Sequence, residues 1–202
     1  MNFRTIHMRL QQDDALRTFY EKQMLDHVIK EKFELATNTE NSFRIYYLQR
    51  HAVKNERGGN IKWRKIFDAS SCERKGPSLN DVLEMGLYLL PEVLACLLRF
   101  RGHPVSVIGD MKQDFLQLSQ DRRDRDLTSF FSYTISKDDK GIRYTTHEVG
   151  NYRFTGLPFG LTCSPFLQSV TVRELATMCT EEYTNTAHCY IKVSLWITSA
   201  PG

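Results

Sequence analysis

The sequence predicts an α+β fold in which short helices accompany antiparallel hairpins. Its 202 residues are 41% hydrophobic and 11% aromatic, a composition typical of a globular chain with a sizeable core. Two pairs of strand-like segments are each joined by a turn-forming segment, which indicates hairpins. Helix-like segments lie around them without the regular alternation of β–α–β units, and this order favours α+β over α/β.

Capping residues and hydrophobic spacing define the elements of the first half. Asp13-Asp14 offers a helix N-cap, and apolar residues recur after it at helical spacing. The expected elements are a helix from Asp13 to about Lys32, a strand from Phe43 to Leu48, the basic loop Lys54 to Asn60, a strand from Ile61 to Phe67 paired with the first, a helix from Ser78 to Leu83, and a helix from Pro91 to Phe100.

Proline, glycine and charged turns divide the second half. His103-Pro104 ends the preceding helix, and a short apolar strand, Val105 to Ile108, then leads to Asp110. The further expected elements are a helical turn at Asp114 to Leu118, a solvated charged loop at Asp121 to Asp126, strands at Phe130 to Ile135 and Ile142 to Val149 joined by the turn Lys137 to Gly141, and a helix from Pro165 to about Cys179. We expect the last helix to cover one face of a sheet that contains the strand ending at Asp110.

Charge and cysteine usage narrow the functional classes. The net charge of +3 permits a polyanionic partner without requiring one. The five cysteines are odd in number and form no Cys-x-x-Cys pair, which favours a reduced intracellular protein, cytoplasmic or nuclear, over a disulfide scaffold. The apolar run from Leu87 to Leu98 contains Glu92 and is too short to cross a bilayer. We therefore expect no membrane partner.

The most informative pattern is an acid after a strand, followed about forty residues later by a glycine-rich turn. Asp110 ends the apolar strand, and the segment Tyr152 to Phe166 passes through a turn containing Gly156 and Gly160. An acid that faces a turn open to close backbone approach suits a nucleotide and metal site. On local pattern alone, an acid after a strand, such as Asp110, is more often a turn or helix-capping residue than a metal ligand, and the glycines could merely shape a connection.

Ordered sequence blocks add a resemblance to a known family. The blocks are Tyr47 to Val53, Trp63 to Ser71, Gly76 to Gly86, Leu98 to Arg101 followed by the Asp110 segment, and then the glycine-proline segment Gly156 to Pro165. In this order, over about residues 15 to 200, they resemble the reverse transcriptases of BEL/Pao-type long-terminal-repeat retrotransposons. The resemblance implies the fingers and palm of a right-hand polymerase: a helical lead-in at residues 1–40, a fingers-like segment at 41–104 and a truncated palm-like segment at 105–202.

The resemblance also implies a two-metal nucleotidyl transfer with an RNA/DNA primer-template and a dNTP. Mg²⁺ or Mn²⁺ is the expected cofactor, and the other domains of the polyprotein are expected to be absent. The implied roles are Asp110 as catalytic and metal-binding acid, the Met111 carbonyl as a metal ligand, Phe115 as the residue that excludes a 2′-hydroxyl, Phe159 and Gly160 beside the incoming nucleotide, Arg64 on the triphosphate, and Arg57 as a second such cation.

One departure from the family decides the expected activity. The family carries a Tyr-x-Asp-Asp hairpin after the palm helix, whereas this chain has no Asp after Asp139. Either Tyr190 to Val193 is a degenerate version, or the four residues are missing between Leu195 and Trp196, which fits the flanking residues better. In both alignments the partner carboxylates are lost, so we expect an inactive enzyme.

Two functions therefore remain open from the sequence. The chain is either an inactive fingers-palm piece of an RNA-directed DNA polymerase or a non-catalytic nucleic-acid- or protein-binding remnant of the same fold. Five cations of the expected finger hairpin favour weak, salt-sensitive binding to nucleic acid. They are Lys54, Arg57, Lys62, Arg64 and Lys65.

Overall fold

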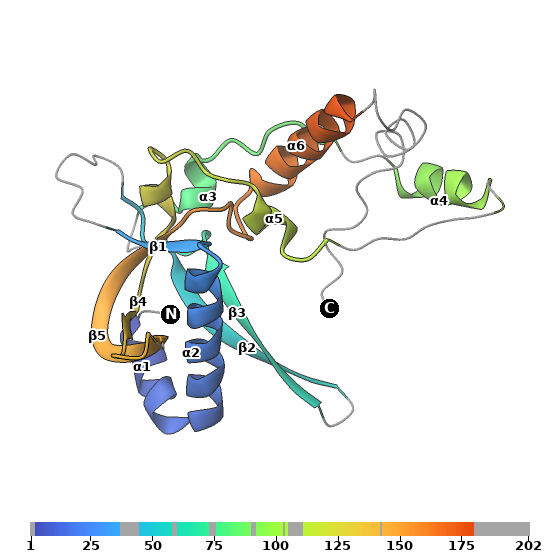
Figure 1. The fold of residues 1–202 in the computed structure, drawn as a ribbon. Coiled ribbons are helices and arrows are strands. Elements are labelled where there is room, and N and C mark those ends of the chain that lie inside the picture. Colours follow the sequence, from blue (N-terminus) through green and yellow to red (C-terminus); the bar gives the residue numbers. More distant parts are fainter. Residues whose placement is uncertain are drawn as a thin grey trace. The chain divides into compact units, whose positions relative to one another are not determined.

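The computed structural model describes residues 3–36, 45–57, 60–72, 76–89, 92–102, 104, 111–141 and 143–179. This part of the chain contains six α-helices, one 3-10 helix and five strands in two antiparallel sheets (Figure 1). The α+β class predicted from the sequence is confirmed. None of the described helices is long and apolar enough to cross a membrane.

The chain forms two compact units, and each unit takes two separate stretches of sequence. The first unit comprises Met1–Leu83 and Ser119–Leu161, and the second comprises Glu84–Leu118 and Thr162–Gly202. The expected division into residues 1–40, 41–104 and 105–202 concerns segments of a polymerase and stays a prediction.

Two helices open the first unit. α1 (Phe3–Gln12) and α2 (Asp14–Ile29) are separated by Asp13, whose Oδ1 accepts a hydrogen bond of 2.9 Å from the Leu16 amide. This N-cap was predicted, and α2 ends close to the predicted position. No separate helix was predicted before Asp13, although the expected helical lead-in at residues 1–40 includes α1. α1 forms because Ile6 and Leu10, one turn apart, are buried against Leu16 and Tyr20 of α2.

A three-stranded sheet carries the aromatic core of the first unit. Its order is β1-β5-β4, with β1 at Phe33–Leu35, β4 at Ser129–Lys137 and β5 at Arg143–Phe154. Phe33 pairs with Phe154, and Phe130 pairs with Tyr152. The ring centroids of Phe33, Phe130 and Phe154 lie 4.7–5.3 Å apart, mostly edge to face, a geometry that stabilises beyond the area buried.

The hairpin predicted from the sequence is present, but its first strand begins later in the chain than expected. β2 (Gln49–Arg57) pairs with β3 (Asn60–Asp68), whereas the strand was expected from Phe43 to Leu48. Within that range, residues 43–44 lie outside the described residues, and Tyr47 belongs to no strand but forms an isolated bridge to Ser129. Most of the expected basic loop is strand. Charged residues are tolerated there because one face of an antiparallel pair can remain in water.

The charged loop that precedes β4 is less solvated than expected. Arg153 Nη1 lies 2.7 Å from Asp126 Oδ1, and Arg153 Nε lies 2.6 Å from Glu34 Oε1. Arg125 completes the cluster with a 2.9 Å contact to Glu34. Asp126 is buried in the 3-10 helix Arg125–Thr128, so these ion pairs join that turn to β1 and β5. Only the first part of the loop, with the exposed Arg123–Asp121 pair, matches the solvated expectation.

Capping chemistry sets the short helices. α3 (Leu79–Val82), in the first unit, begins with the predicted Ser78 cap, and Asp81 Oδ2 accepts a hydrogen bond of 2.8 Å from the Ser78 amide. The second unit holds α4 (Val93–Arg101), α5 (Asp114–Gln117) and α6 (Ser164–Met178). All three match predicted helices. The expected strand Val105–Ile108 lies outside the described residues, so its pairing stays a prediction.

Helix α6 shows an inverted distribution of polarity. Ser164, Gln168 and Ser169 are buried, while several apolar side chains of the helix are exposed. Those apolar residues are Leu167, Val170, Leu175 and Met178. In the same unit, Gly86 (φ +78°) lies against Phe166, since a Cβ at this glycine would stand 2.3 Å from the ring. Of the buried polar residues of α6, Gln168 forms a hydrogen bond with Asp114 of the same unit.

Candidate functional site

Arg64 lies on the open face of the β2–β3 hairpin. It pairs with Val53 in register, and residues directly opposite in an antiparallel pair share a face. Val53 and the neighbouring Ile66 on that face are 40% and 38% exposed. Arg64 is partly exposed and makes no ion pair with any residue that the structure describes. Its guanidinium is therefore available to a ligand.

Lys65, the next residue, lies on the buried face. Its Nζ is shielded from solvent and has no hydrogen-bond partner among the described residues. Three aromatic rings surround it, with centroids 5.6 Å away for Tyr20, 5.3 Å for Phe33 and 5.5 Å for Phe67. Burial, followed by repulsion from Arg50, holds the pKa of Lys65 well below its usual value. The prediction that Lys65 contributes to phosphate binding with the other four cations of the hairpin is therefore wrong, because its amine is buried.

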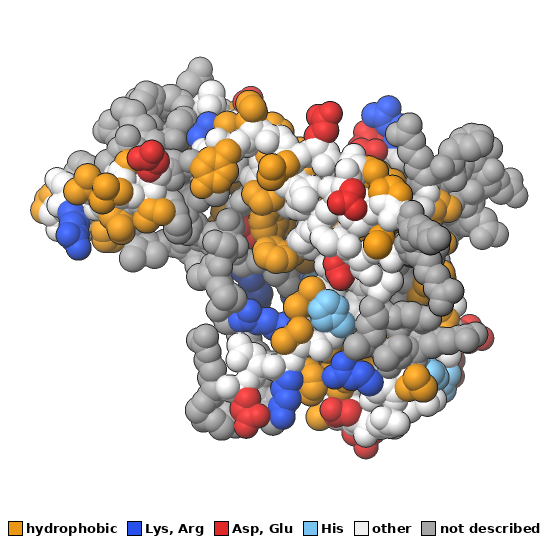
Figure 2. All heavy atoms as spheres, turned by 180° about the vertical axis from the view of Figure 1, so that it is seen from behind, with side chains coloured by type: hydrophobic (Ala, Val, Ile, Leu, Met, Phe, Trp, Pro, Cys, Tyr) orange, Lys and Arg blue, Asp and Glu red, His pale blue; other side chains and the backbone are white. Residues whose placement is uncertain are grey.

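The other cations of the hairpin differ in their exposure and in whether the structure describes their side chains. Lys54 is exposed and lies 3.4 Å from Glu56 Oε2. Arg57 and Lys62 occupy strand positions in β2 and β3, while their side chains fall outside the described part, so the role of Arg57 stays a prediction. Charged and hydrophobic side chains are interspersed on the face seen in Figure 2. Among the described side chains of these cations, Arg64 is partly exposed and forms no ion pair with a described residue, and its expected contact with a triphosphate stays a prediction.

The glycine turn that holds Phe159 and Gly160 is fastened to the end of β3. Gly160 has φ +100°, and a Cβ there would stand 3.0 Å from the Phe67 carbonyl oxygen. Asn80 Nδ2 donates to the Gly160 carbonyl at 3.0 Å and to Ser70 Oγ at 2.9 Å. The turn therefore requires glycine both for its backbone conformation and for its close approach to the strand.

Phe159 presents its ring outward from this turn. The side chain is 66% exposed, an unusual state for a large aromatic residue. At the other end of the turn, Gln120 holds Gly156 with a hydrogen bond of 2.6 Å from Nε2 to the carbonyl oxygen. The two anchors fix the backbone on either side of Phe159, so the exposed ring stands on a rigid base. Such a ring suits stacking on a planar ligand.

The remaining described site residues, Met111 and Phe115, belong to the second unit. Met111 is exposed and precedes α5, and Phe115 is 6% exposed within α5. The Phe115 amide donates to Asp114 Oδ1 at 2.9 Å. Asp110 lies outside the described residues, so the metal-binding roles of Asp110 and Met111 stay predictions. No three acidic, histidine or cysteine residues within the described ranges gather in a way that would hold a metal ion.

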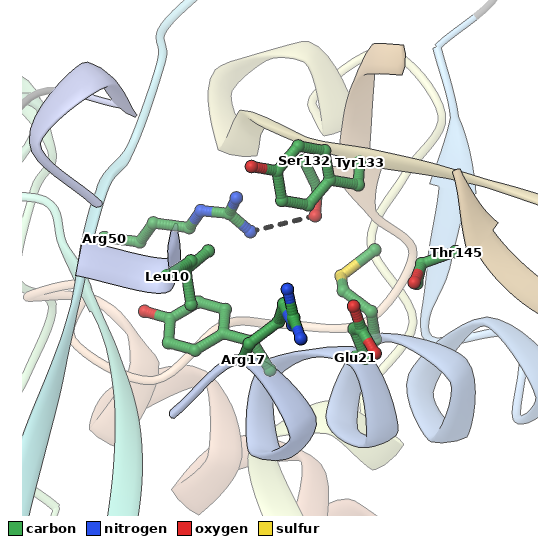
Figure 3. A pocket seen from close by; sticks show the side chains of 9 residues that line it. Leu10, Arg17, Glu21, Arg50, Ser132, Tyr133 and Thr145 are labelled. Carbon is green, nitrogen blue, oxygen red and sulfur yellow. Dashed lines mark hydrogen bonds between the residues drawn. The ribbon is translucent and has the colours of Figure 1, made fainter. Parts of the chain in front are cut away.

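A small pocket in the first unit lies apart from the predicted site residues. Arg50 Nη1 donates to Ser132 Oγ at 3.0 Å, and both side chains point into the pocket (Figure 3). The guanidinium also stands over the rings of Tyr20 and Phe130, and burial lowers the pKa of Arg50 to about 10. The pocket has room for about one water molecule. It is therefore a feature of the core.

Sequence reasoning missed Asn80, Gln168 and the burial of Lys65. Asn80 carried one usable signal, because it lies between Ser78 and Asp81 of a recognisable capping box. No protein-family model matches the chain, and a comparison with curated proteins also gives no match.

Proposed function

We propose that this chain is the fingers and palm region of an RNA-directed DNA polymerase of the BEL/Pao retrotransposon type. We further propose that it lacks nucleotidyl-transfer activity as it stands. The ordered sequence blocks motivate the assignment, and the observation that carries it is the guanidinium of Arg64, which has no ion-pair partner among the described residues and lies on the open face of the hairpin. In the proposed function this cation holds the triphosphate or a template phosphate.

Arginine suits that role on physical grounds. Its planar fork of donors matches two phosphate oxygens at once, and its charge persists at any physiological pH. The neighbouring exposed side chains, Val53 and Ile66, are neutral, so within this face they do not compete with a phosphate for the guanidinium. A single buried lysine beside it cannot take over the task, because the Lys65 amine is enclosed by aromatic rings.

The glycine turn supports the same proposal. Asn80 donates a hydrogen bond to the Gly160 carbonyl, and the Gly160 backbone lies against β3 at Phe67. Phe67 follows Arg64 by three residues in the same strand. A phosphate-binding cation and an exposed aromatic ring thus belong to neighbouring segments of one compact unit. Stacking on Phe159 and pairing of a phosphate with Arg64 would act on a nucleotide together. This combination favours a nucleotide or nucleic-acid ligand over a purely apolar one.

The proposed catalytic silence follows from the sequence after α6. Two dications in an in-line phosphoryl transfer need shared acidic ligands, and Asp139 is the last aspartate of the chain. Asp110 and the Met111 carbonyl would supply part of a metal site for Mg²⁺ or Mn²⁺. Loss of several kcal/mol of metal-borne stabilisation costs roughly a factor of ten for each 1.4 kcal/mol.

The alternative is a non-catalytic binding remnant, and one observation favours its protein-binding form. The exposed apolar residues of α6 include Leu175 and Met178, and contiguous exposed apolar surface commonly marks an interaction site. In this alternative the chain has the same fold but does not bind nucleic acid. It predicts that primer-template binding is absent even at low salt.

A primer-extension assay tests the proposal. The chain is compared with a version in which Tyr-Val-Asp-Asp is restored between Leu195 and Trp196, each with and without Asp110→Asn, in Mg²⁺ and in Mn²⁺. We expect no incorporation by the chain as it stands, and incorporation by the restored version that Asp110→Asn abolishes. Incorporation by the unrestored chain that Asp110→Asn removes would overturn catalytic silence. Failure of both versions to bind primer-template would overturn the polymerase assignment.

A further inference from the structure

A buried amide in the second unit contacts the acid that precedes the expected sugar-selecting residue. Gln168 lies in the middle of α6 with 1% of its surface exposed. Its Nε2 donates to Asp114 Oδ2 at 2.8 Å. A buried amide is costly without partners, and a charge-assisted hydrogen bond to a carboxylate is stronger than one between neutral groups. The Gln168–Asp114 contact therefore constrains α5 against α6.

The same carboxylate continues the connection to Phe115. Asp114 Oδ1 accepts from the Phe115 amide at 2.9 Å, while Oδ2 accepts from Gln168. The two oxygens thus bind separate donors, one on each helix. If a shift of Gln168 makes the Asp114 carboxylate rotate, the hydrogen bond between Asp114 Oδ1 and the Phe115 amide changes as well.

Helix α5 has little internal structure to hold Phe115 by itself. It spans four residues, Asp114–Gln117, and so forms barely one turn. The residue before it, Gln113, has φ +53° and ψ 41°, a left-handed conformation that L residues adopt at an energetic cost. Its side chain provides no cap. The orientation of this turn therefore depends on contacts from outside it, and Gln168 provides one.

We propose that Gln168 is a positioning residue that sets the orientation of Phe115 through Asp114, and thereby the discrimination between deoxyribonucleotides and ribonucleotides. The inference rests on the proposed polymerase function, in which Phe115 excludes a 2′-hydroxyl. Steric exclusion depends on placement, and a displacement of about 1 Å at a reacting centre can cost on the order of 100-fold. Gln168 itself does not contact the nucleotide in this proposal.

A series of variants that exchanges the amide and the carboxylate between positions 114 and 168 tests the contact. Gln168→Glu places two carboxylates against each other and removes the donor. Asp114→Asn keeps Oδ1 for the Phe115 amide, and its Nδ2 can donate to Gln168 Oε1 after rotation of the glutamine amide. In the double variant, the introduced asparagine amide donates to the introduced glutamate carboxylate, which restores the connection in reverse. Thr171→Glu, on the exposed side of α6, is the control for added charge.

The first readout uses the chain as it stands. We expect Gln168→Glu to accelerate hydrogen exchange at the Phe115 amide at least about tenfold, because weakening of its acceptor lowers local protection. The double variant should return the rate to near the starting value, and Thr171→Glu should leave it unchanged. Unchanged exchange in Gln168→Glu would overturn the proposal, whether or not the polymerase assignment holds.

The second readout uses the version with the restored Tyr-Val-Asp-Asp segment. The ratio of dNTP to rNTP incorporation should fall about 10- to 100-fold in Gln168→Glu and recover in the double variant. A loss of stability with an unchanged ratio would show a merely structural role and overturn the proposal. If the restored version incorporates nothing, the proposed function fails, and amide exchange alone decides whether Gln168 positions Phe115.

Discussion

Arg64 and Lys65 are consecutive residues of β3 whose side chains enter opposite environments. Arg64 lies with the exposed Val53 and Ile66, whereas the Lys65 amine is enclosed by the rings of Tyr20, Phe33 and Phe67. The alternation of a strand produces this separation. One cation of the pair is therefore available to a ligand, and the other places a basic group in the core.

Replacing Lys65 with methionine should stabilise the protein at pH 7 by roughly 1–3 kcal/mol, because an amine without a partner is costly to bury. The lowered pKa of Lys65 also predicts a pH dependence. Between the folded pKa and 10.5 the unfolded chain binds one more proton, so the free energy of unfolding rises with pH, by up to about 1.4 kcal/mol per unit. Urea unfolding from pH 7 to 9 measures both effects.

The Lys65→Met variant should lose the part of this slope that Lys65 causes. The window ends at pH 9 because burial raises the pKa of Tyr20 to about 12, and that phenol contributes an opposite slope at higher pH. Arg64→Met is the matched control on the open face and should leave the slope unchanged. A Lys65→Met variant that is less stable at pH 7 would contradict the assignment.

His27 should make the protein sensitive to acid. Burial, followed by repulsion from Lys65, lowers the pKa of His27 to about 4. Between pH 6.5 and 4 the unfolded chain therefore binds the extra proton, and stability falls with falling pH, in total by about 3 kcal/mol from this group. His27→Phe keeps the ring packed on Phe33, 4.6 Å away, and should reduce the loss between pH 6.5 and 4.5 in denaturant titrations.

The exposed His147 provides the comparison for this test. His147→Phe removes a histidine from the surface and should leave the acid-induced loss of stability as it is. If both variants reduce the loss equally, burial of His27 is not its cause.

Gly160→Ala should destabilise the first unit by roughly 1–2 kcal/mol. The positive φ disfavours any L side chain, and the new methyl group would stand 3.0 Å from the Phe67 carbonyl oxygen. Gly141 has φ +78° with nothing within 4 Å of its Cβ position, so Gly141→Ala shares only the backbone cost. The difference between their urea midpoints measures the contact with β3, and equal midpoints would show that this contact is relaxed.

Arg64→Gln should weaken binding to an RNA/DNA primer-template and make it less sensitive to salt. A phosphate contact releases about one counterion, so loss of the contact lowers the slope of log K against log salt by about one. Fluorescence anisotropy over a KCl series measures the slope. Lys65→Met should leave the slope unchanged because its amine is buried. Equal losses in both variants would place the phosphate elsewhere on the hairpin.

Elements with a local signal were predictable from the sequence. The Asp13 cap and hydrophobic spacing located α2, and Ser78 with Asp81 located α3. β2 was misplaced because its residues are polar on the solvent side, so the apolar segment before it resembled the strand. α1 depends on tertiary burial of Ile6 and Leu10.

The candidate site was predictable only where its residues carry a local sequence signal. The turn at Gly160 follows from glycine chemistry, and strict alternation along Trp63, Arg64 and Lys65 could have separated the two cations. The Gln168–Asp114 contact joins residues 54 positions apart, and no local pattern encodes it. The functional roles expected of the site residues all stay predictions: those of Asp110, Met111, Arg57, Arg64, Phe115, Phe159 and Gly160.

The pairing of β1 with β5 leaves β1 without its partner strand for part of the synthesis of this chain. Glu34 of β1 and its partner Arg153 are 119 positions apart, so a ribosome that adds about 5–20 residues per second delivers the partner on the order of ten seconds later. During that delay the edge of β1 and the aromatic ring of Phe33 have no native neighbour from β5. Contacts of such high sequence separation also slow the search for the native state. Nascent chains that stop before Phe154 should therefore depend on chaperones that cover unpaired strands.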